Sequence, residues 1–492
     1  MATPLPGSAR SAADPAVQSA PISPQTISLE AVLPIDPAVT LGTLQNGLTY
    51  YVRHNDKPEN RAELWLVVNA GSLQEDQDQL GLAHFLEHMA FNGTEHFEKH
   101  DLVDYLERIG MRFGPDVNAF TSFDETVYTL RIPTDDPEII QTALQILEDW
   151  TKAISLEDED IDKERGVVVE EWRLGRGMEA RLRDQQFPVL FQDSRYADRL
   201  PIGNKTIIEE APYEALRRFY RDWYRPDLMA IIAIGDFDAT SMVAQIRDHF
   251  GALRNPEEPR ARETYPVPDH KETLFAITSD VEATITTVGI YQKLPKRDRP
   301  ATRDYRASIV EQIYHGLLNA RLDELRQQAD PPFLFAGSTS GGFVRSRDVI
   351  YQVAGVQDGG LTRGLTALLS EVERIKQHGF TSSELDRLKL NLLRTYQQAY
   401  EERSTRQSAS YASEYMRNFL EMEPSPGIEF ELGLVKRFLP TIALDEINRV
   451  AGQWTSEENR VILVSGPDKT DVQLPSQAEL AAILHEVKEQ TL

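Results

Sequence analysis

The sequence contains no cysteine among its 492 residues. This absence excludes disulfide scaffolds, thiolate zinc sites, iron–sulfur clusters and cysteine nucleophiles. Basic residues are also scarce relative to acidic ones. There are 52 Lys and Arg against 78 Asp and Glu, which gives a formal net charge of −26. Nucleic-acid binding needs basic patches that contact phosphates, so this charge argues against a nucleic-acid partner. It also argues against docking on an anionic membrane surface.

Long hydrophobic runs are missing too. The most apolar stretch, residues 228–234, is far shorter than the roughly 20 residues of a transmembrane helix, so we expect no membrane insertion. Residues 1–28 are rich in Ala, Pro and Ser and contain no hydrophobic signal core. We interpret residues 1–40 as a flexible leader left after an export signal was removed, which favours a periplasmic or otherwise exported protein. A cytoplasmic protein with a flexible N-terminus is the alternative.

An internal repeat organises the rest of the chain. Trp223 precedes Gly235 by twelve residues, and Trp454 precedes Gly466 by the same twelve, so the two segments are offset by 231 residues. Each segment has the pattern of a helix, a Trp, a turn, an apolar strand and a Gly. Such self-similarity indicates two homologous domains.

The repeat, together with grouped strands and several long helices, predicts an α+β protein with two mostly antiparallel sheets, each packed with helices on one face. We place the first domain at residues 41–255 and the homologous domain at 272–475. A Pro- and charge-rich linker (256–271) joins them, and a helical tail (476–492) follows. The second domain is expected to contain helices at about 303–328, 361–378 and 382–420.

The segment GLAHFLEHMAFNGT places His84 and His88 four residues apart, so on a helix both imidazoles lie on one face and can reach one cation. Glu87 precedes His88 and can reach a water molecule beside that cation. This H-x-x-E-H pattern is the inverse of the H-E-x-x-H zinc motif. A surface helix with two solvated histidines is the alternative. However, apolar residues surround the motif, and buried polar groups need a partner such as a metal.

A catalytic zinc ion usually has three protein ligands, so a third ligand must come from another segment. The segment DKERGVVVEEWRLG offers Glu164, Glu170 and Glu171 in a helical pattern. Glu164 and Glu171 are two turns apart and share one face, so one could bind the metal while the other orients a histidine. A solvated acidic helix face is the alternative interpretation.

Taken together, HFLEHMAFNGT, VNAFTSFDETVYTL and ERGVVVEEWR resemble the insulinase/pitrilysin family of zinc peptidases, the inverzincins, and within it the bacterial PqqL-like zinc proteases. The resemblance covers nearly the whole chain, including the segment DWYRPDLMAIIAIGDF. It implies half of a clamshell fold, one Zn²⁺ per chain and hydrolysis of unfolded peptides or small proteins.

The resemblance also implies roles for individual residues: metal ligands His84, His88 and Glu171, general base Glu87, and supporting catalytic acid Glu164. Glu171 follows His88 by 83 residues, which is longer than the usual family spacing and implies a short insertion. Glu170 is therefore a less favoured ligand.

A substrate site follows from the same resemblance. In the family, an edge strand at the position of VNAFT pairs with an extended peptide through backbone hydrogen bonds. This implies that Asn118, Ala119 and Thr121 bind substrate, with Asn118 and Ala119 nearest the scissile bond. The alternation in this segment fits an ordinary hairpin equally well.

The second domain lacks the metal motif. The offset of 231 places His315, Leu318 and Asn319 at its positions, so the base and the second ligand are missing and we expect a non-catalytic copy. The family also holds substrate with an Arg and a Tyr seven residues apart, which come from an opposing half of the clamshell. The nearest match here, Arg326 and Phe333, lacks the hydroxyl. We therefore expect a second half as partner: a homologous subunit, a second copy or a fused C-terminal half.

The leading hypothesis is thus a zinc endopeptidase. The runner-up is a non-catalytic scaffold or peptide-binding subunit of a processing complex, against which the intact motif argues. An acidic carbohydrate- or cation-binding protein is a third hypothesis, but it leaves His84, Glu87 and His88 unexplained.

Overall fold

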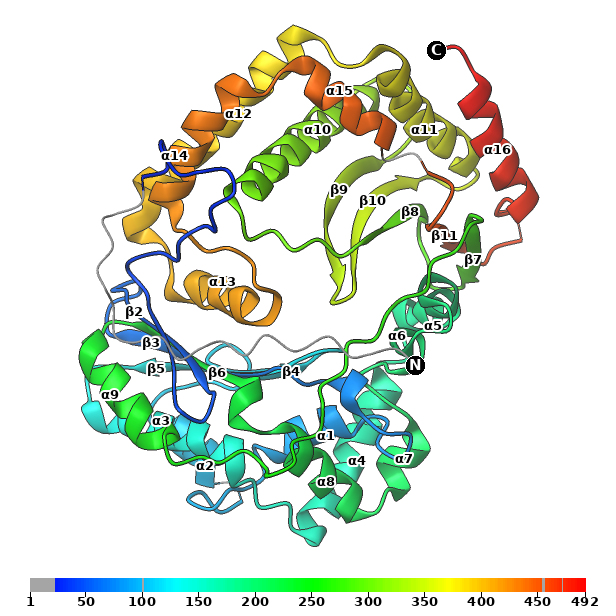
Figure 1. The fold of residues 1–492 in the computed structure, drawn as a ribbon. Helices are drawn as coiled ribbons and strands as arrows, with labels where there is room; N and C mark the ends of the chain where they lie inside the picture. Colours follow the sequence, from blue (N-terminus) through cyan, green and yellow to red (C-terminus); the bar gives the residue numbers. More distant parts are fainter. Residues whose placement is uncertain (1–22, 100, 454–455, 471) are drawn as a thin grey trace, which may run out of the picture.

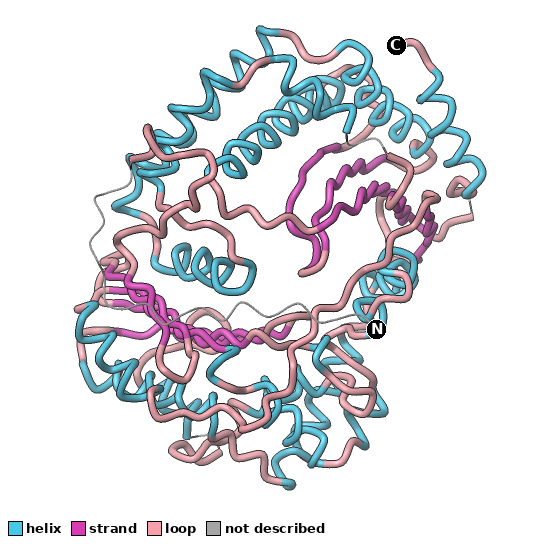
Figure 2. Tube along the Cα trace, in the orientation of Figure 1, coloured by secondary structure: helices cyan, strands magenta, loops and turns pink. Residues whose placement is uncertain are grey.

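The computed structural model describes residues 23–99, 101–453, 456–470 and 472–492 (Figure 1). These residues form two mostly antiparallel sheets with helices packed against them, which is the α+β fold that the sequence predicts (Figure 2).

The first sheet has the strand order β1-β2-β6-β3-β5-β4. Its strands are β1 (Thr40–Thr43), β2 (Thr49–His54), β3 (Arg61–Val68), β4 (Val117–Thr121), β5 (Thr126–Pro133) and β6 (Met229–Gly235). Neighbours are antiparallel except β2 and β6, which are parallel. Among the described strands, β4 lies at the edge of this sheet and pairs only with β5.

The helices of this half lie mainly on one side of the sheet (Figure 1). They are η1 (Ser72–Gln74), α1 (Leu82–Met89), α2 (Asp101–Arg108), α3 (Pro137–Lys152), α4 (Asp158–Leu174), α5 (Met178–Phe191), α6 (Arg195–Asp198), α7 (Lys205–Glu210), α8 (Tyr213–Trp223), η2 (Pro226–Leu228) and α9 (Ala239–Phe250). The large core between this sheet and its helices contains residues of α1, α3, α4, α8 and α9.

The second sheet has the strand order β7-β11-β8-β10-β9. Its strands are β7 (Leu274–Asp280), β8 (Thr286–Pro295), β9 (Phe335–Val344), β10 (Arg347–Val356) and β11 (Arg460–Pro467). The accompanying helices are α10 (Thr302–Arg326), α11 (Leu361–His378), α12 (Ser382–Glu401), η3 (Glu402–Thr405), α13 (Ser408–Glu421), α14 (Ile428–Phe438), η4 (Leu439–Thr441), α15 (Leu444–Gln453) and α16 (Gln477–Glu489).

The two sheets share one plan. In the first sheet β6 lies between its parallel neighbour β2 and its antiparallel neighbour β3. In the second, β11 lies between its parallel neighbour β7 and its antiparallel neighbour β8. β6 begins at Met229 and β11 at Arg460, so the offset of 231 residues also holds in the structure. Trp454, which the repeat includes, lies outside the described residues.

The first sheet is covered on both faces, which corrects the expectation of one covered face. Alternate residues of a strand point to opposite faces. In β6, Met229 and Ile231 belong to the core shared with α1, whereas Ile232 packs against Tyr411 and Tyr415 of α13 on the other face. Neither face of β6 contacts water, which explains why its residues form an uninterrupted apolar run.

The second sheet is covered in the same way by a helix from the first half of the chain. Leu190 and Phe191 of α5 pack with Ala276 of β7 and with Val461 and Leu463 of β11. Each sheet therefore has one face covered by a helix from the other half of the chain. We call α5 and α13 the exchanged helices.

Two sequence expectations need revision. The single helix expected at 382–420 is interrupted, because η3 and an extended Arg406 end α12 and redirect the chain into α13. The expected leader is described only from residue 23. There, Ile27 and Leu33 are buried in the core of the second half, so these side chains attach the segment to the protein although many of its other residues are exposed.

Helices long and apolar enough to span a bilayer are absent from the part of the chain that the structure describes.

Candidate metal centre

The helix α1 carries both histidines of the motif. Leu82, Phe85, Leu86 and Met89 are at most 2% exposed and pack into the core of the first half. This packing fixes the rotation of the helix, because residues three and four apart share a face. His84 and His88 lie on the face that contacts α4, with their ring centroids 4.7 Å apart.

The side chain of Glu171 on α4 completes a cluster of three possible metal ligands. Nε2 of His84 lies 3.6 Å from Oε1 of Glu171, and Nε2 of His88 lies 3.2 Å from Oε2. One ligand atom from each residue lies within 4.8 Å of the other two. The structure thus brings together the three residues that the sequence predicts as ligands.

This geometry fits zinc. Ligand atoms about 2.1 Å from a tetrahedral zinc are separated from one another by about 3.4 Å. The two distances from the imidazole nitrogens to the Glu171 carboxylate are close to that separation. Two imidazoles and one carboxylate also form a donor set that zinc accepts in catalytic sites, where a further position stays open. Glu171 is about half exposed (49%), so the cluster is accessible from solvent.

Glu164 lies two turns before Glu171 on α4 and contacts His88. Nδ1 of His88 donates a hydrogen bond to Oε1 of Glu164 (2.8 Å), and Nδ2 of Asn92 donates to Oε2 (2.8 Å). The bond fixes Nδ1 as a protonated nitrogen of His88 and leaves Nε2 facing Glu171. His84 has no equivalent partner, because its buried Nδ1 forms no hydrogen bond with any described residue.

The two imidazoles have opposite electrostatic environments. Burial, with the neighbouring His88, lowers the pKa of His84 to about 4. Burial also acts to lower the pKa of His88, but its hydrogen bonds to Glu164 and Glu171 outweigh burial and raise the pKa to about 9. The hydrogen bond from His88 lowers the pKa of Glu171. The ionised carboxylates of Glu164 and Glu171 therefore stabilise a positive charge beside the two imidazoles.

Glu87 is the buried carboxyl group of the site. It is 8% exposed, and burial raises its pKa to about 7. Oγ1 of Thr121, at the end of β4, donates a hydrogen bond to Oε2 of Glu87 (2.6 Å). A carboxyl group with a pKa near neutrality can both accept and return a proton at physiological pH.

The strand β4 runs beside this carboxyl group. Asn118 is exposed and Ala119 is half-buried, and both pair with β5 on one side of the strand only. Thr121 was predicted as a substrate-binding residue, and the structure shows in addition its hydrogen bond to Glu87.

The N-terminus of α1 is capped by a side chain from the preceding loop, not by its own N-cap residue. Its first residue follows Gly81, which has a φ of 100° and no side chain to cap the helix. Instead, Oε1 of the buried Glu75 accepts hydrogen bonds from the N–H groups of Gly81 (3.0 Å) and Ala83 (2.9 Å). These bonds satisfy two backbone donors that the helix itself leaves unpaired. They hold the residue immediately before His84.

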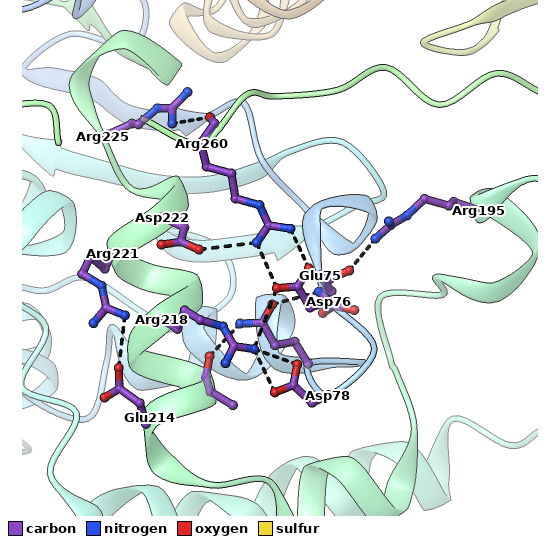
Figure 3. Close-up of polar contacts among 12 residues, drawn as sticks. Glu75, Asp76, Asp78, Arg195, Glu214, Arg218, Arg221, Asp222, Arg225 and Arg260 are labelled. Carbon is purple, nitrogen blue, oxygen red and sulfur yellow. Dashed lines mark hydrogen bonds and ion pairs between the residues drawn. The ribbon is translucent and has the colours of Figure 1, made fainter. Parts of the chain in front are cut away.

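Ion pairs fix the loop that carries Glu75 (Figure 3). Arg195 donates to the Glu75 carbonyl, and Arg260 joins Asp76 (2.5 Å) to Asp222 of α8 (3.4 Å). The start of α1 is therefore tied both to α8 and to the segment that follows the first half.

Sequence reasoning did not find Asn92 or Glu75. Asn92 has a local signal, because it lies one helical turn after His88, the residue with which it shares Glu164. Glu75 has none, because it lies in a loop and meets α1 only through tertiary structure.

Comparisons with known proteins give the family of the chain. The profile of the insulinase peptidases, peptidase family M16, matches residues 50–184. The profile of the inactive domain of M16 peptidases matches residues 211–392. The chain belongs to the insulinase family. The peptidase profile thus lies within the first half, whereas the profile of the inactive domain begins at residue 211 in the first half and extends to residue 392 in the second.

Curated relatives of this insulinase-family chain include a zinc protease PQQL-like protein from Arabidopsis thaliana, which is 38% identical over 409 residues. That alignment covers 83% of this chain and 40% of the relative. The probable zinc protease PqqL of Escherichia coli is 31% identical over 432 residues, which cover 87% of this chain and 45% of the relative. The chain spans less than half the length of these relatives.

Solved structures show the same fold. The crystal structure of the first half of the periplasmic protease PqqL from Escherichia coli superimposes with a TM-score of 0.88 at 29% identity, covering 94% of this chain and 99% of that chain. The full PqqL structure gives the same TM-score, with 51% of that chain covered. This insulinase-family chain therefore has the fold of one clamshell half.

Proposed function

We propose that this chain is the metal-binding half of a zinc-dependent endopeptidase that hydrolyses unfolded peptides or small proteins. One observation carries the proposal: two imidazole nitrogens and a carboxylate converge within zinc-binding distance of one another, beside a buried carboxyl group. In the proposal, one zinc ion is held by three ligands, namely His84, His88 and Glu171.

Each remaining residue of the site has a separate task. When bound, zinc supplies Lewis acidity toward the peptide carbonyl and toward the attacking water. Glu87 takes a proton from that water and returns it to the leaving amine, which its pKa near neutrality favours. Glu164 holds His88 in the tautomer that presents Nε2 to the metal.

The substrate would bind in an extended form along β4. An edge strand has unpaired backbone N–H and C=O groups, which can form a ladder with a peptide. Asn118 and Ala119 lie on this edge, and Thr121 follows them beside Glu87. A peptide paired with β4 would therefore pass the carboxyl group that moves the proton.

A complete chamber would need a second half, which we propose as a homologous subunit, a second copy or a fused C-terminal half. The curated relatives are more than twice as long as the part this chain matches. Arg326, the nearest match to the family's substrate-holding Arg, pairs with Asp323 on its own helix (2.6 Å), and Phe333 is buried.

The division into a catalytic domain (41–255) and a homologous non-catalytic domain (272–475), joined by 256–271 and followed by 476–492, is part of this proposal. An exported, periplasmic location is also proposed, since the similar PqqL of Escherichia coli is described as periplasmic.

The test measures peptide cleavage and metal content in the wild-type chain and in Glu87→Gln. We expect one zinc per chain in both proteins. Turnover should fall by about 10³-fold or more in the variant, toward the upper end of what general acid–base catalysis contributes. Chelation should abolish wild-type activity, and added zinc should restore it.

Two outcomes would contradict the proposal. Cleavage that survives complete zinc removal would exclude the mechanism. Zinc-loaded wild-type protein that does not cleave peptides, alone or with a second half, would instead favour a peptide-binding scaffold.

A further inference from the structure

A turn next to the metal centre is contacted by the second half of the chain. This turn, residues 122–125, connects β4 to β5, and the N–H of Ser122 donates to the carbonyl of Glu125 within it (2.8 Å). Thr121, the residue before the turn, holds Glu87. Any displacement of the turn therefore acts on the hydroxyl that contacts the carboxyl group.

Arg345 reaches this turn from the other half. It lies between β9 and β10, at the tip of their hairpin, and its Nη2 donates to Oε2 of Glu125 (2.9 Å). Its Nη1 donates to the carbonyl of Leu420 near the end of α13. Both side chains of the ion pair are mostly buried, at 13% and 20% exposed, so the pair is only weakly screened by water.

The neighbouring residue of the turn is held as firmly. Oδ1 of Asp124 accepts from Arg262 (3.0 Å), and Oδ2 accepts from the hydroxyl of Tyr196 (2.8 Å). The carbonyls of Ser122 and Phe123 accept from backbone N–H groups of η1 (3.1 and 2.8 Å). Every residue of the turn thus has a polar contact outside it, and among the described residues Arg345 supplies the one from the hairpin of the second sheet.

We propose that Arg345 is a positioning residue for the reaction. By holding Glu125, it fixes the turn and keeps Thr121 against Glu87. This inference rests on the proposed function, and it assigns a task to the half that lacks metal ligands. The ladder between β4 and β5 holds the peptide-binding edge independently of Arg345. Loss of Arg345 should therefore reduce kcat and leave KM unchanged.

The experiment compares Arg345→Gln with Arg321→Gln in the full chain. Arg321 is a matched control, because it also forms a mostly buried pair with a glutamate, Glu384 (2.6 Å, 16% and 18% exposed), but inside the second half. We expect kcat to fall about tenfold in Arg345→Gln, as small displacements of catalytic groups do. The control should keep its kcat while losing comparable thermal stability. Arg345→Lys, which keeps the charge, should recover part of the activity.

A double mutant separates positioning from general weakening. If Arg345 acts through Thr121, Arg345→Gln should have no further effect on kcat in a Thr121→Val background. Equal effects of Arg345→Gln in both backgrounds would overturn the inference, as would an equal loss of kcat in Arg321→Gln.

Amide hydrogen exchange tests the same contact without turnover. Amides of the turn, residues 122–125, should exchange faster in Arg345→Gln than in the wild type, and Arg321→Gln should leave them unchanged. Unchanged exchange in Arg345→Gln overturns the inference even if the wild type cleaves peptides. A wild type that binds zinc but stays inactive both alone and with a second half counts against the proposed function, while the exchange result still decides the role of Arg345.

Discussion

The two halves of the chain use the same junction of helix and edge strand in different ways. In the first half, α1 meets β4 through Glu87 and Thr121. In the second half, α10 meets β9 through Asn319, whose amide exchanges two hydrogen bonds with the backbone of Ser338 (2.7 and 3.0 Å). His315 adds a hydrogen bond to the Ser338 hydroxyl (2.9 Å). Polar residues of the helix thus fix the edge strand in both halves.

The halves also differ at the positions of the two carboxylates of α4. The offset that relates the halves places Thr395 at the position of Glu164 and Glu402 at that of Glu171. Thr395 lines one cavity of about 490 Å³ with His315 and Asn319, but it brings no charge. Glu402 lies on an exposed turn and accepts from Gln398 (2.8 Å). The shared scaffold holds an edge strand in both halves. The first half adds a cluster of possible metal ligands, because it has His88 where the second half has Asn319 and because α4 carries two glutamates.

The largest expected effect is the loss of zinc affinity when Glu171 is removed from α4. Glu171→Ala should lower zinc affinity by more than about 100-fold, which is the upper end of the cost of losing an outer-shell partner. Activity should be lost with the metal. Glu170→Ala is the control, because Glu170 is exposed and pairs with Arg173 (2.6 Å). Zinc competition with a chelator measures both. Equal losses in the two variants would show that α4 contributes only general negative charge.

A smaller effect is expected at Glu164. Glu164→Gln keeps an acceptor for His88 but removes the charge, and we expect zinc affinity to fall by about 10- to 100-fold. Glu159→Gln on the same helix serves as control, because Glu159 is exposed and pairs with Lys163. An unchanged affinity in Glu164→Gln would remove the carboxylate's role in orienting His88.

The buried histidine of the second half should behave as a core residue. Burial lowers the pKa of His315 to about 4, below its ordinary value of 6.5. Between these values the unfolded chain binds a proton that the folded chain does not. Stability from this group is therefore complete above pH 6.5 and falls as the pH drops toward 4. The loss should reach about 2–3 kcal/mol. Urea unfolding of wild type and His315→Gln at several pH values measures it, and parallel stability curves would contradict it.

The smallest effect on activity is expected from Asn319→Ala. The substitution leaves the N–H and C=O of Ser338 without their amide partner, which should cost about 1–3 kcal/mol of folding free energy. Zinc content and kcat should not change, because the metal centre lies on helices α1 and α4 of the first half. A loss of zinc in this variant would mean that the two junctions are coupled more strongly than their separation implies.

Local patterns were sufficient to predict much of the fold and of the metal site. The four-residue spacing of His84 and His88 and the seven-residue spacing of Glu164 and Glu171 determine shared helix faces, and both pairs lie together as expected. The repeat likewise predicted two sheets of one plan. These features depend on regular spacings along the sequence, so they can be predicted from the sequence pattern alone.

Contacts between distant segments could not be predicted in this way. Glu87 and Thr121 are 34 residues apart, and Arg345 lies 220 residues from Glu125. The second cover of the first sheet was missed because an apolar run such as that of β6 requires burial on both faces but does not say which helix provides it. The break in the expected helix at 382–420 was missed because its polar residues suit a helix surface as well as a turn.

The exchanged helices also constrain synthesis on the ribosome. When β3 and β6 have emerged, their face with Trp65, Val67 and Ile232 stays bare until Tyr411 and Tyr415 of α13 are translated. Exposed apolar strands of an incomplete chain are prone to aggregate. We therefore expect a fragment ending near residue 255 to be poorly soluble, because it lacks the helix that covers this face.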